Sequence, residues 1–314
     1  MAGSKIAGSI NLAGRDLLKL SDLTPAELSA LLAQAAELKR DPYRVELRGR
    51  VLGLLFQKAS TRTRASFTAA MAQCGGSTLD LVPTVMQVSR GEPLQDTARV
   101  LSRYLDVIAI RTYDQKELET FAEYADVPVI NALTDQFHPC QVLADLLTIQ
   151  ENFGQLAGLT LAYCGDGNNV AHSLLLGCAM SGIHIRVATP PGYEPDAAVV
   201  EQARTLAQGS QVLVLQDPQE AVSGAQVVYT DVWASMGQEA EAEARKATFL
   251  PYQVNAELLQ RADPQAIVLH CLPAHREEEI TTEVLEGSQS RVWDQAENRL
   301  HVQKALLIQV LGAG

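Results

Sequence analysis

The sequence predicts an α/β protein of two domains, each a parallel sheet covered by helices. Short apolar runs typical of buried strands alternate along the chain with segments of helical spacing, which is the pattern of parallel sheets with helices on both faces. The alternation pauses near residue 150, where a long helix ends at Gly154, and resumes at Leu159. We expect a first domain over 1–150, joined by a C-terminal helix over 300–314, and a second over 151–299. A small-molecule site is expected in the cleft between the domains.

Composition and charge exclude several classes of protein. The chain has 314 residues, of which 47% are hydrophobic and 20% charged, as in globular proteins. The net charge is −12 and no run is rich in Lys or Arg, which argues against a nucleic-acid or membrane partner. No stretch approaches the roughly 18 apolar residues of a membrane helix. Residues 1–16 lack the apolar core of a signal peptide, and the five cysteines form no CxxC pair. These features predict reduced thiols and a cytoplasmic protein.

The elements follow in order from local patterns. Thr24, Pro25 and Glu27 form a helix-start signature with a capping box. The apolar run Val51–Gln57 predicts the first buried strand. Further strands are predicted at Thr78–Val82, Val107–Arg111, Pro128–Ile130, Leu159–Cys164, Ile183–Ala188, Val212–Leu215, Val227–Thr230 and Ile267–Cys271. Further helices are predicted at Ala65–Gln73, Pro93–Tyr104, Gln115–Tyr124, Gln141–Asn152, Ala171–Met180, Ala197–Ala207 and Leu300–Leu311.

The most informative segment is FQKASTRTRASF, residues 56–67, which follows a predicted strand and opens a predicted helix. The unpaired amides of a first helical turn stabilise an anion. Hydroxyl and guanidinium donors follow one another there: Ser60, Thr61, Arg62, Thr63 and Arg64. This combination predicts a phosphate site. The alternative, a capped helix start with solvated arginines, explains Ser or Thr but not both arginines.

His138 precedes Pro139 at another predicted helix start. Nearby helix amides favour its neutral form, which can donate a hydrogen bond to a carbonyl oxygen. A histidine that only caps the helix is the alternative. Arg111, at the end of a predicted strand, adds a cation that favours the functional interpretation.

A glycine turn, Gly165–Asn169, follows a strand in the second half. It resembles a dinucleotide fingerprint, but Val170 takes the place of the third glycine and no acid ends the next strand. We therefore expect no nicotinamide cofactor. The turn is instead expected to let Asn168 or Asn169 approach another ligand.

Two further polar groups follow strands. Asp231 can pair with a substrate ammonium, with the Ser-Met-Gly turn at 235–237 closing over it; a loop aspartate that caps a helix is the alternative. Cys271, with His270 or His275, suggests a nucleophile or zinc, but the spacing fits neither. A thiol in a binding site is the better interpretation, and no metal is expected.

Nearly all these groups follow the carboxyl end of a strand, where open parallel sheets bind ligands. The motifs FQKASTRTRASF, HPCQ, GDGNN, DVWASMGQE and HCLP stand here in the order found in the ornithine carbamoyltransferases, and the chain resembles that family over essentially its full length. The DxxxSMG and HCLP pair indicates ornithine rather than aspartate as the acceptor.

The resemblance implies transfer of a carbamoyl group from carbamoyl phosphate to L-ornithine, in arginine biosynthesis. The implied carbamoyl phosphate site comprises Ser60, Thr61, Arg62, Thr63, Gln87, Arg111, His138, Gln141, Cys271, Leu272 and Arg299. The implied ornithine site comprises Asn169, Asp231, Ser235 and Met236, and the implied catalytic residues are Arg62, Arg111, His138 and Cys271. The resemblance also implies no cofactor, and a homotrimer or a multiple of trimers in which Gln87 reaches the neighbouring subunit's site. A carbamoyltransferase for N-acetylornithine or putrescine, a catabolic enzyme and a non-catalytic binding protein stay open as alternatives.

Overall fold

The computed structural model describes residues 11–207, 209–234 and 242–313. The chain divides into two compact units: Met1–Cys140 with Arg299–Gly314, hereafter the first unit, and Gln141–Asn298, the second unit. Both divisions fall inside helices, α5 (Pro139–Phe153) and α12 (Val292–Val310). No helix within the described ranges is long and apolar enough to cross a membrane.

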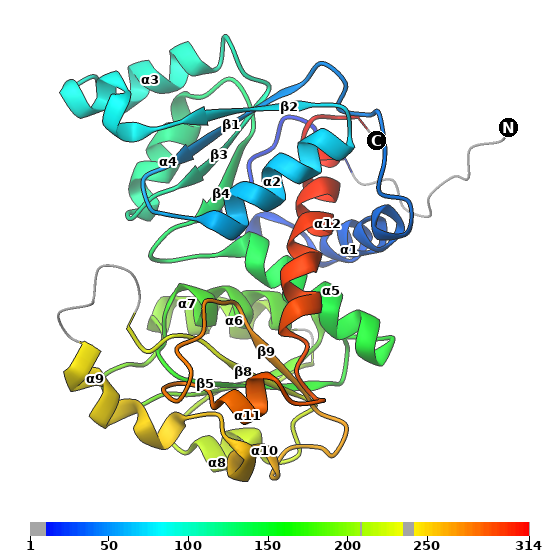
Figure 1. Cartoon of the computed structure of the whole chain (residues 1–314), viewed down its shortest axis with the longest axis vertical. Coiled ribbons are helices and arrows are strands. Elements are labelled where there is room, and N and C mark those ends of the chain that lie inside the picture. Colours follow the sequence, from blue (N-terminus) through cyan, green and yellow to red (C-terminus); the bar gives the residue numbers. More distant parts are fainter. Residues whose placement is uncertain (1–10, 208, 235–241, 314) are drawn as a thin grey trace, which may run out of the picture. The chain divides into compact units, whose positions relative to one another are not determined.

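The first unit holds a parallel sheet in the order β2-β1-β3-β4 (Figure 1). Its strands are β1 (Val51–Phe56), β2 (Ser77–Leu81), β3 (Val107–Arg111) and β4 (Val129–Leu133). Its remaining helices are α1 (Pro25–Arg40), α2 (Thr61–Gln73), α3 (Leu94–Leu101) and α4 (Gln115–Tyr124), with 3-10 turns η1 (Leu20–Asp22), η2 (Pro83–Val85) and η3 (Gln87–Arg90). One face of the sheet packs on α3 and α4 through a core that includes Leu55, Ile108 and Phe121. Every residue of β3 is buried, as expected of a strand covered on both faces.

The capping signature at the first helix is confirmed. The Thr24 hydroxyl accepts from the Glu27 amide at 3.2 Å, and the Glu27 carboxylate accepts from the Thr24 amide at 2.8 Å. Pro25 is the first helical residue. Leu28, Leu31, Leu32 and their successors at helical spacing are buried, so the local start signal and the apolar stripe select the same helix.

The second unit holds a parallel sheet in the order β7-β6-β5-β8-β9. Its strands are β5 (Thr160–Cys164), β6 (His184–Ala188), β7 (Val212–Leu215), β8 (Val227–Thr230) and β9 (Ile267–His270). Its remaining helices are α6 (Asn169–Ser181), α7 (Ala197–Leu206), α8 (Pro218–Val222), α9 (Ala242–Phe249), α10 (Ala256–Leu259) and α11 (Thr282–Leu285), with the turn η5 (Leu250–Tyr252). A core from β5, β8 and β9 packs on α8, α10 and α11, and α6 and α7 lie side by side on the opposite face (Figure 1).

All nine predicted strands are confirmed. Buried parallel strands such as β1 leave a continuous apolar run in the sequence, whereas β2 is largely exposed and includes polar residues. The helices differ more. Helix α2 begins at Thr61 rather than Ala65, and α12 begins at Val292 rather than Leu300. Helices α8 to α11 were not predicted; they are 4 to 8 residues long, too short to show a periodic pattern.

Candidate active site

In the first unit, β2 lies on one side of β1, and β3 and β4 lie on the other. The order of strand addition therefore changes sides between β1 and β3, and parallel sheets bind ligands at such a point. Phe56 at the end of β1 lies in register with Arg111 at the end of β3. The segment after β1 leads directly into α2, and Arg111 is only 9% exposed. The two strand ends therefore bring the Ser-Thr-Arg segment and Arg111 to the same edge of the sheet.

The start of α2 does not use its serine as a cap. Ser60 holds the N-cap position in an extended conformation, and its side chain makes no capping hydrogen bond. Thr61 and Arg62 are exposed, whereas Thr63 is buried. Because the Ser60 side chain does not cap the helix, the simple capping interpretation is not supported. Hydroxyl groups, the Arg62 guanidinium and the first amides of α2 lie together at the start of the helix, a combination suited to a phosphate.

Arg64 differs from Arg62 in its partners. It forms an ion pair with Asp80 on β2, and its guanidinium lies 5.1 Å from the centre of the Phe56 ring. The expectation that both arginines of the segment serve as phosphate donors is thus not supported for Arg64. A helical turn places residues 62 and 64 in different directions, which a linear motif does not show.

Arg299 joins the same part of the first unit from far along the sequence. Its Nη2 donates to the Thr63 hydroxyl at 2.9 Å, and the Arg299 side chain is buried. Further along α12, the buried Lys304 donates to the Pro42 carbonyl at 2.8 Å and to the Gln73 side chain at the end of α2. These bonds hold α12 against α2. After Arg62 and Arg111, Arg299 is the third arginine in this part of the first unit, near the start of α2.

His138, directly before α5, is 5% exposed. Burial, and after it the charges of Arg299, Arg111 and Arg62, hold the pKa of His138 well below 6.5. The neutral form expected from the sequence is therefore supported, but the main cause is burial beside three guanidiniums rather than helix amides. A neutral imidazole within a cluster of arginines can donate a hydrogen bond to a carbonyl oxygen and does not act as a further cation.

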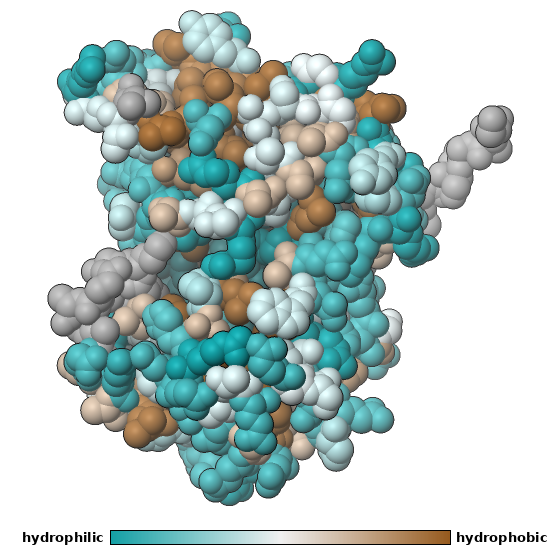
Figure 2. All heavy atoms as spheres, in the orientation of Figure 1, coloured by the Kyte–Doolittle hydropathy of each residue, from teal (hydrophilic) through white to brown (hydrophobic). Residues whose placement is uncertain are grey.

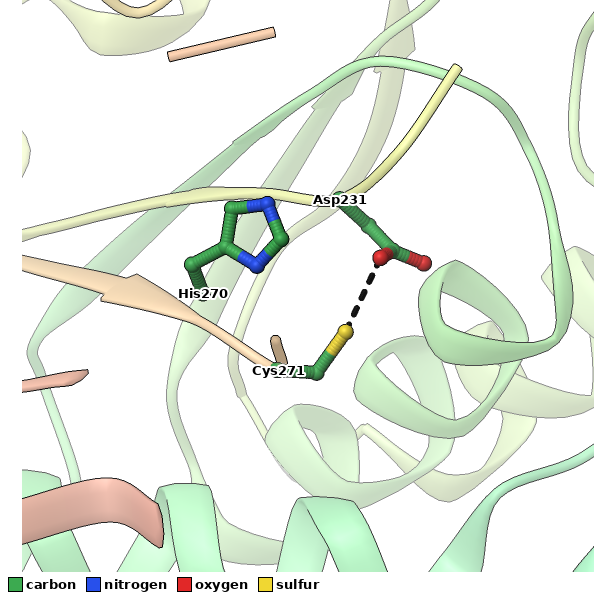
Figure 3. A group of neighbouring side chains, drawn as sticks. All are labelled: Asp231, His270 and Cys271. Atoms are coloured by element: carbon green, nitrogen blue, oxygen red, sulfur yellow. Dashed lines mark hydrogen bonds between the residues drawn. The ribbon is translucent and has the colours of Figure 1, made fainter. Parts of the chain in front are cut away.

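In the second unit, the order of strand addition changes sides between β5 and β8, so a ligand site is expected there too. Polar side chains follow both strands: Asn168 comes after β5 and Asp231 after β8. The Asn168 amide donates to Asp231 Oδ2 at 2.9 Å. Figure 3 shows the second bond, in which Cys271 Sγ donates to Asp231 Oδ1 at 2.9 Å. Asp231 is 5% exposed and precedes no helix directly, so the helix-capping alternative is excluded. A third donor, the Val232 backbone amide, also reaches Asp231 Oδ1, at 2.8 Å, so three neighbours hold this carboxyl group at the edge of the sheet.

Asn168 also caps α6, because its side-chain oxygen accepts from the Val170 and Ala171 amides. Asn169 is the first residue of α6 and is half-buried. Gly167 serves packing rather than ligand approach: a Cβ there would stand 2.3 Å from the Pro195 backbone nitrogen. The glycine is thus required by a neighbouring segment of the same unit.

Asp231, His270 and Cys271 could together offer ligand atoms to a metal, since these atoms lie within 4.8 Å of one another. Both ring nitrogens of His270 have partners, however. Nδ1 accepts from the Leu272 amide at 2.9 Å, and Nε2 lies 3.0 Å from Glu279 Oε1. A metal would have to displace one of them. The Cys271 thiol is the most accessible of the five cysteines, and burial raises the pKa of Cys140 and Cys164 to about 12.

The other predicted residues lie in different settings. Gln141, in the first turn of α5, is 1% exposed and donates from Nε2 to Asp145 Oδ1 at 2.9 Å. Leu272 has a left-handed backbone with φ of 59°. Gln87 opens the exposed turn η3. Ser235 and Met236 lie outside the described residues.

Sequence reasoning missed several buried polar groups near these residues. Lys58 pairs with Asp135 and lies 4.1 Å from the Tyr113 ring centre, next to the phosphate segment. Asp145 and Gln295 are buried in the second unit. A carboxylate inside the apolar helix after His138 was a signal for Asp145, because a buried charge requires hydrogen-bond partners; Gln295 gives no such local signal.

Comparisons with known proteins identify the family of this chain. Residues 15–151 match the aspartate/ornithine carbamoyltransferase, carbamoyl-P binding domain, and residues 157–310 match the Asp/Orn binding domain of that family. An ornithine carbamoyltransferase from Nostoc sp. is 66% identical over 303 residues, which cover 96% of this chain and 99% of the relative. The crystal structure of ornithine carbamoyltransferase from Gloeobacter violaceus is 58% identical with a TM-score of 0.88, covering 96% of this chain and 99% of that one. The enzyme from Pyrococcus furiosus is 52% identical with a TM-score of 0.94, covering 97% and 99%.

Proposed function

The chain belongs to the aspartate/ornithine carbamoyltransferase family, and on that basis we propose how its residues carry out carbamoyl transfer. The enzyme transfers the carbamoyl group of carbamoyl phosphate to L-ornithine, which gives L-citrulline and phosphate. The acceptor amine attacks the carbonyl carbon, a tetrahedral intermediate forms with a negative oxygen, and phosphate leaves.

The phosphate of the donor binds at the start of α2. Ser60, Thr61 and Thr63 donate through their hydroxyls and Arg62 through its guanidinium, as the helix terminus favours a dianion. Arg299, hydrogen-bonded to Thr63, lies on the same side and supplies a further cation. These donors also stabilise the phosphate as it leaves.

Arg111 and His138 act on the carbonyl oxygen of the donor. The low pKa of His138 keeps its imidazole neutral, so it donates a hydrogen bond and adds no charge to the three arginines. The observation that carries the mechanism is this buried neutral histidine among three guanidiniums. Donors aimed at an oxyanion typically contribute about 10²–10³-fold to the rate.

Gln141 and Leu272 hold the NH2 group of the donor. The Gln141 Nε2 atom donates to Asp145 Oδ1, and its Oε1 is the acceptor that we assign to the NH2 group. The second acceptor is the Leu272 carbonyl oxygen.

Four residues form the proposed ornithine site and bind its amino-acid end: Asn169, Asp231, Ser235 and Met236. Asp231 supplies the carboxylate for the α-ammonium group. Cys271 lies at Asp231 and contacts the side-chain amine and the carbamoyl group; its role is to orient the amine. Only the neutral amine can attack, and a free alkyl ammonium has a pKa near 10.4, so the site must select the neutral form.

The test of substrate is an acceptor assay. Phosphate release from carbamoyl phosphate is measured with ornithine, N-acetylornithine, putrescine or no amine. Release that depends on ornithine supports the proposal, release with another amine supports a related carbamoyltransferase, and binding without release supports a non-catalytic protein.

The donor is an acyl phosphate, so transfer runs towards citrulline, consistent with arginine biosynthesis in the cytoplasm. Arginine auxotrophy on deletion of the gene tests that assignment.

A homotrimer, alone or in multiples, is the proposed assembly. Hydrophobic side chains gather on the visible face of the first unit over β2 and α3 (Figure 2), where Leu79, Val82 and Val100 are 43–47% exposed. An open groove of about 670 Å³ runs along α2 beside small residues such as Ala65, Ala69 and Ala72. An apolar patch and a groove that ends at Ser60 suit contact with a second copy that completes the site.

Gln87 is the residue proposed to reach the neighbouring subunit's carbamoyl phosphate. A Gln87→Ala chain mixed with an Arg62→Ala chain should recover activity, since some sites then combine an intact half from each. Mass measurement confirms the mixed trimers. Mixed trimers without recovery would place Gln87 in its own subunit's site.

A further inference from the structure

Two oxygen atoms are assigned above to the NH2 group of the donor, Gln141 Oε1 and the Leu272 carbonyl. We propose that one buried chain of hydrogen bonds positions both acceptors, so that the enzyme selects a carbamoyl group over an acyl group without NH2. We call this chain the acceptor support; its members are Asp145, Gln295, His270 and Glu279. The inference rests on the proposed function, because that function assigns the two oxygens to the ligand.

The first acceptor is oriented by Asp145. Gln141 and Asp145 are one helical turn apart on α5, and both are buried, with exposed fractions of 1% and 0%. Gln141 Nε2 donates to Asp145 Oδ1 at 2.9 Å. A flipped amide would place the Gln141 oxygen against the carboxylate, so the pair sets which end of the amide faces a ligand.

Gln295, in the first turns of α12, extends the chain to the other acceptor. Its Nε2 donates to the same Asp145 oxygen at 2.7 Å and lies 3.1 Å from the Tyr229 hydroxyl. Its Oε1 accepts from the His270 backbone amide at 2.9 Å. Gln295 is 1% exposed and uses both ends of its amide, so it ties the position of Asp145 to the end of β9.

The second acceptor is positioned by the His270 ring. His270 Nδ1 accepts from the Leu272 amide at 2.9 Å, so the ring proton sits on Nε2, which donates to Glu279 Oε1 at 3.0 Å. Both side chains are fully buried. Leu272 has a φ of 59°, a conformation that leucine rarely adopts without support. The ring bond to its amide supplies that support: it holds the Cys271–Leu272 peptide, which lies directly before the residue whose carbonyl oxygen is the acceptor.

The acceptor support is therefore a set of positioning residues that need not touch substrate. Its loss should affect ligands that have an NH2 group to donate and spare those that do not. Acetyl phosphate is the matched probe, because a methyl group replaces the NH2 and the phosphate is unchanged. A site that accepts hydrogen bonds from a substrate NH2 group discriminates against an analogue without that group, because its acceptors are then left without a donor.

The experiment measures the binding of carbamoyl phosphate and acetyl phosphate to the full-length protein by calorimetry. In Gln295→Met and His270→Gln, the preference for carbamoyl phosphate should fall about 10-fold or more, with acetyl phosphate affinity little changed. His270→Asn should keep the preference within about 3-fold of wild type, because its side-chain oxygen can replace Nδ1 as the acceptor for Leu272. His184→Gln is the control: His184 Nδ1 also accepts a backbone amide, that of Gln211 at 3.1 Å, and the preference should be unchanged.

Three results would overturn the inference. If Gln295→Met and His270→Gln weaken both ligands equally, the residues are only structural. If His270→Asn and His270→Gln lose the preference equally, the Leu272 bond is not the cause; this pair also decides the question should Gln295→Met fail to fold. If wild type has no preference for carbamoyl phosphate, the proposed function fails and this inference with it.

Discussion

The bond between Arg299 and Thr63 joins residues 236 positions apart and can be removed without changing the shape of either side chain greatly. Thr63→Val keeps the branched form of threonine but has no acceptor for the guanidinium. The N···O distance is 2.9 Å, and the two residues are 5% and 2% exposed, so water cannot readily replace the lost partner. A hydrogen bond to a charged group contributes about 1.5–3 kcal/mol, so the free energy of unfolding should fall by about 2 kcal/mol.

The assay is urea unfolding without ligand, compared among wild type, Thr63→Val and Thr63→Ser. Serine keeps the hydroxyl and should retain most of the stability. In an Arg299→Met background, Thr63→Val should cost less than about 0.5 kcal/mol, because the guanidinium is already absent. A full 2 kcal/mol loss in that background would refute the bond as the cause.

The same variants test the phosphate assignment. Thr63→Val should lower kcat/KM for carbamoyl phosphate by about 10²-fold, since a donor to the phosphate is lost from the site. Thr63→Ser should lower it far less. Equal activity in Thr63→Val and wild type would show that the hydroxyl serves only Arg299.

The remaining predictions concern three other groups. Arg62→Ala should reduce kcat/KM by about 10³-fold with normal unfolding, while Arg64→Ala, which removes the partner of Asp80, should leave most activity; similar losses in both would contradict the assignment. Because the pKa of His138 is held below 6.5, the folded protein binds fewer protons than the unfolded chain below that pH. The stability of wild type relative to His138→Gln should therefore fall as the pH drops below about 6.5 and stay level above it; a flat difference from pH 5 to 8 would contradict this. Cys271→Ser should raise KM for ornithine and lower kcat while the rate still rises with pH; loss of that rise would make Cys271 the base.

Local patterns determined the strands, the first helix and the residue types of the site. A strand buried on both faces is apolar along most of its length, so β1, and β3 up to Ile110, are visible in the sequence alone. The capping box of Thr24 and Glu27 is likewise a signal within four residues. Parallel topology then places the ends of β1, β3, β5 and β8 where ligands bind, so the candidate residues after those strands could be named without coordinates.

Only the tertiary structure decided how those residues are held. Arg64 turns to Asp80, whereas Arg299 reaches Thr63, because packing of α2 against β2 and α12 selects the partners and no motif spans that distance. The neutral state of His138 depends on burial beside arginines from three separate segments. Asp145, Gln295, His270 and Glu279 are joined by bonds between residues up to 150 positions apart, and each by itself is an ordinary polar residue in the sequence. Residue types are read locally, but burial and partnership are properties of the folded chain, and they set the charge and orientation of the groups that act.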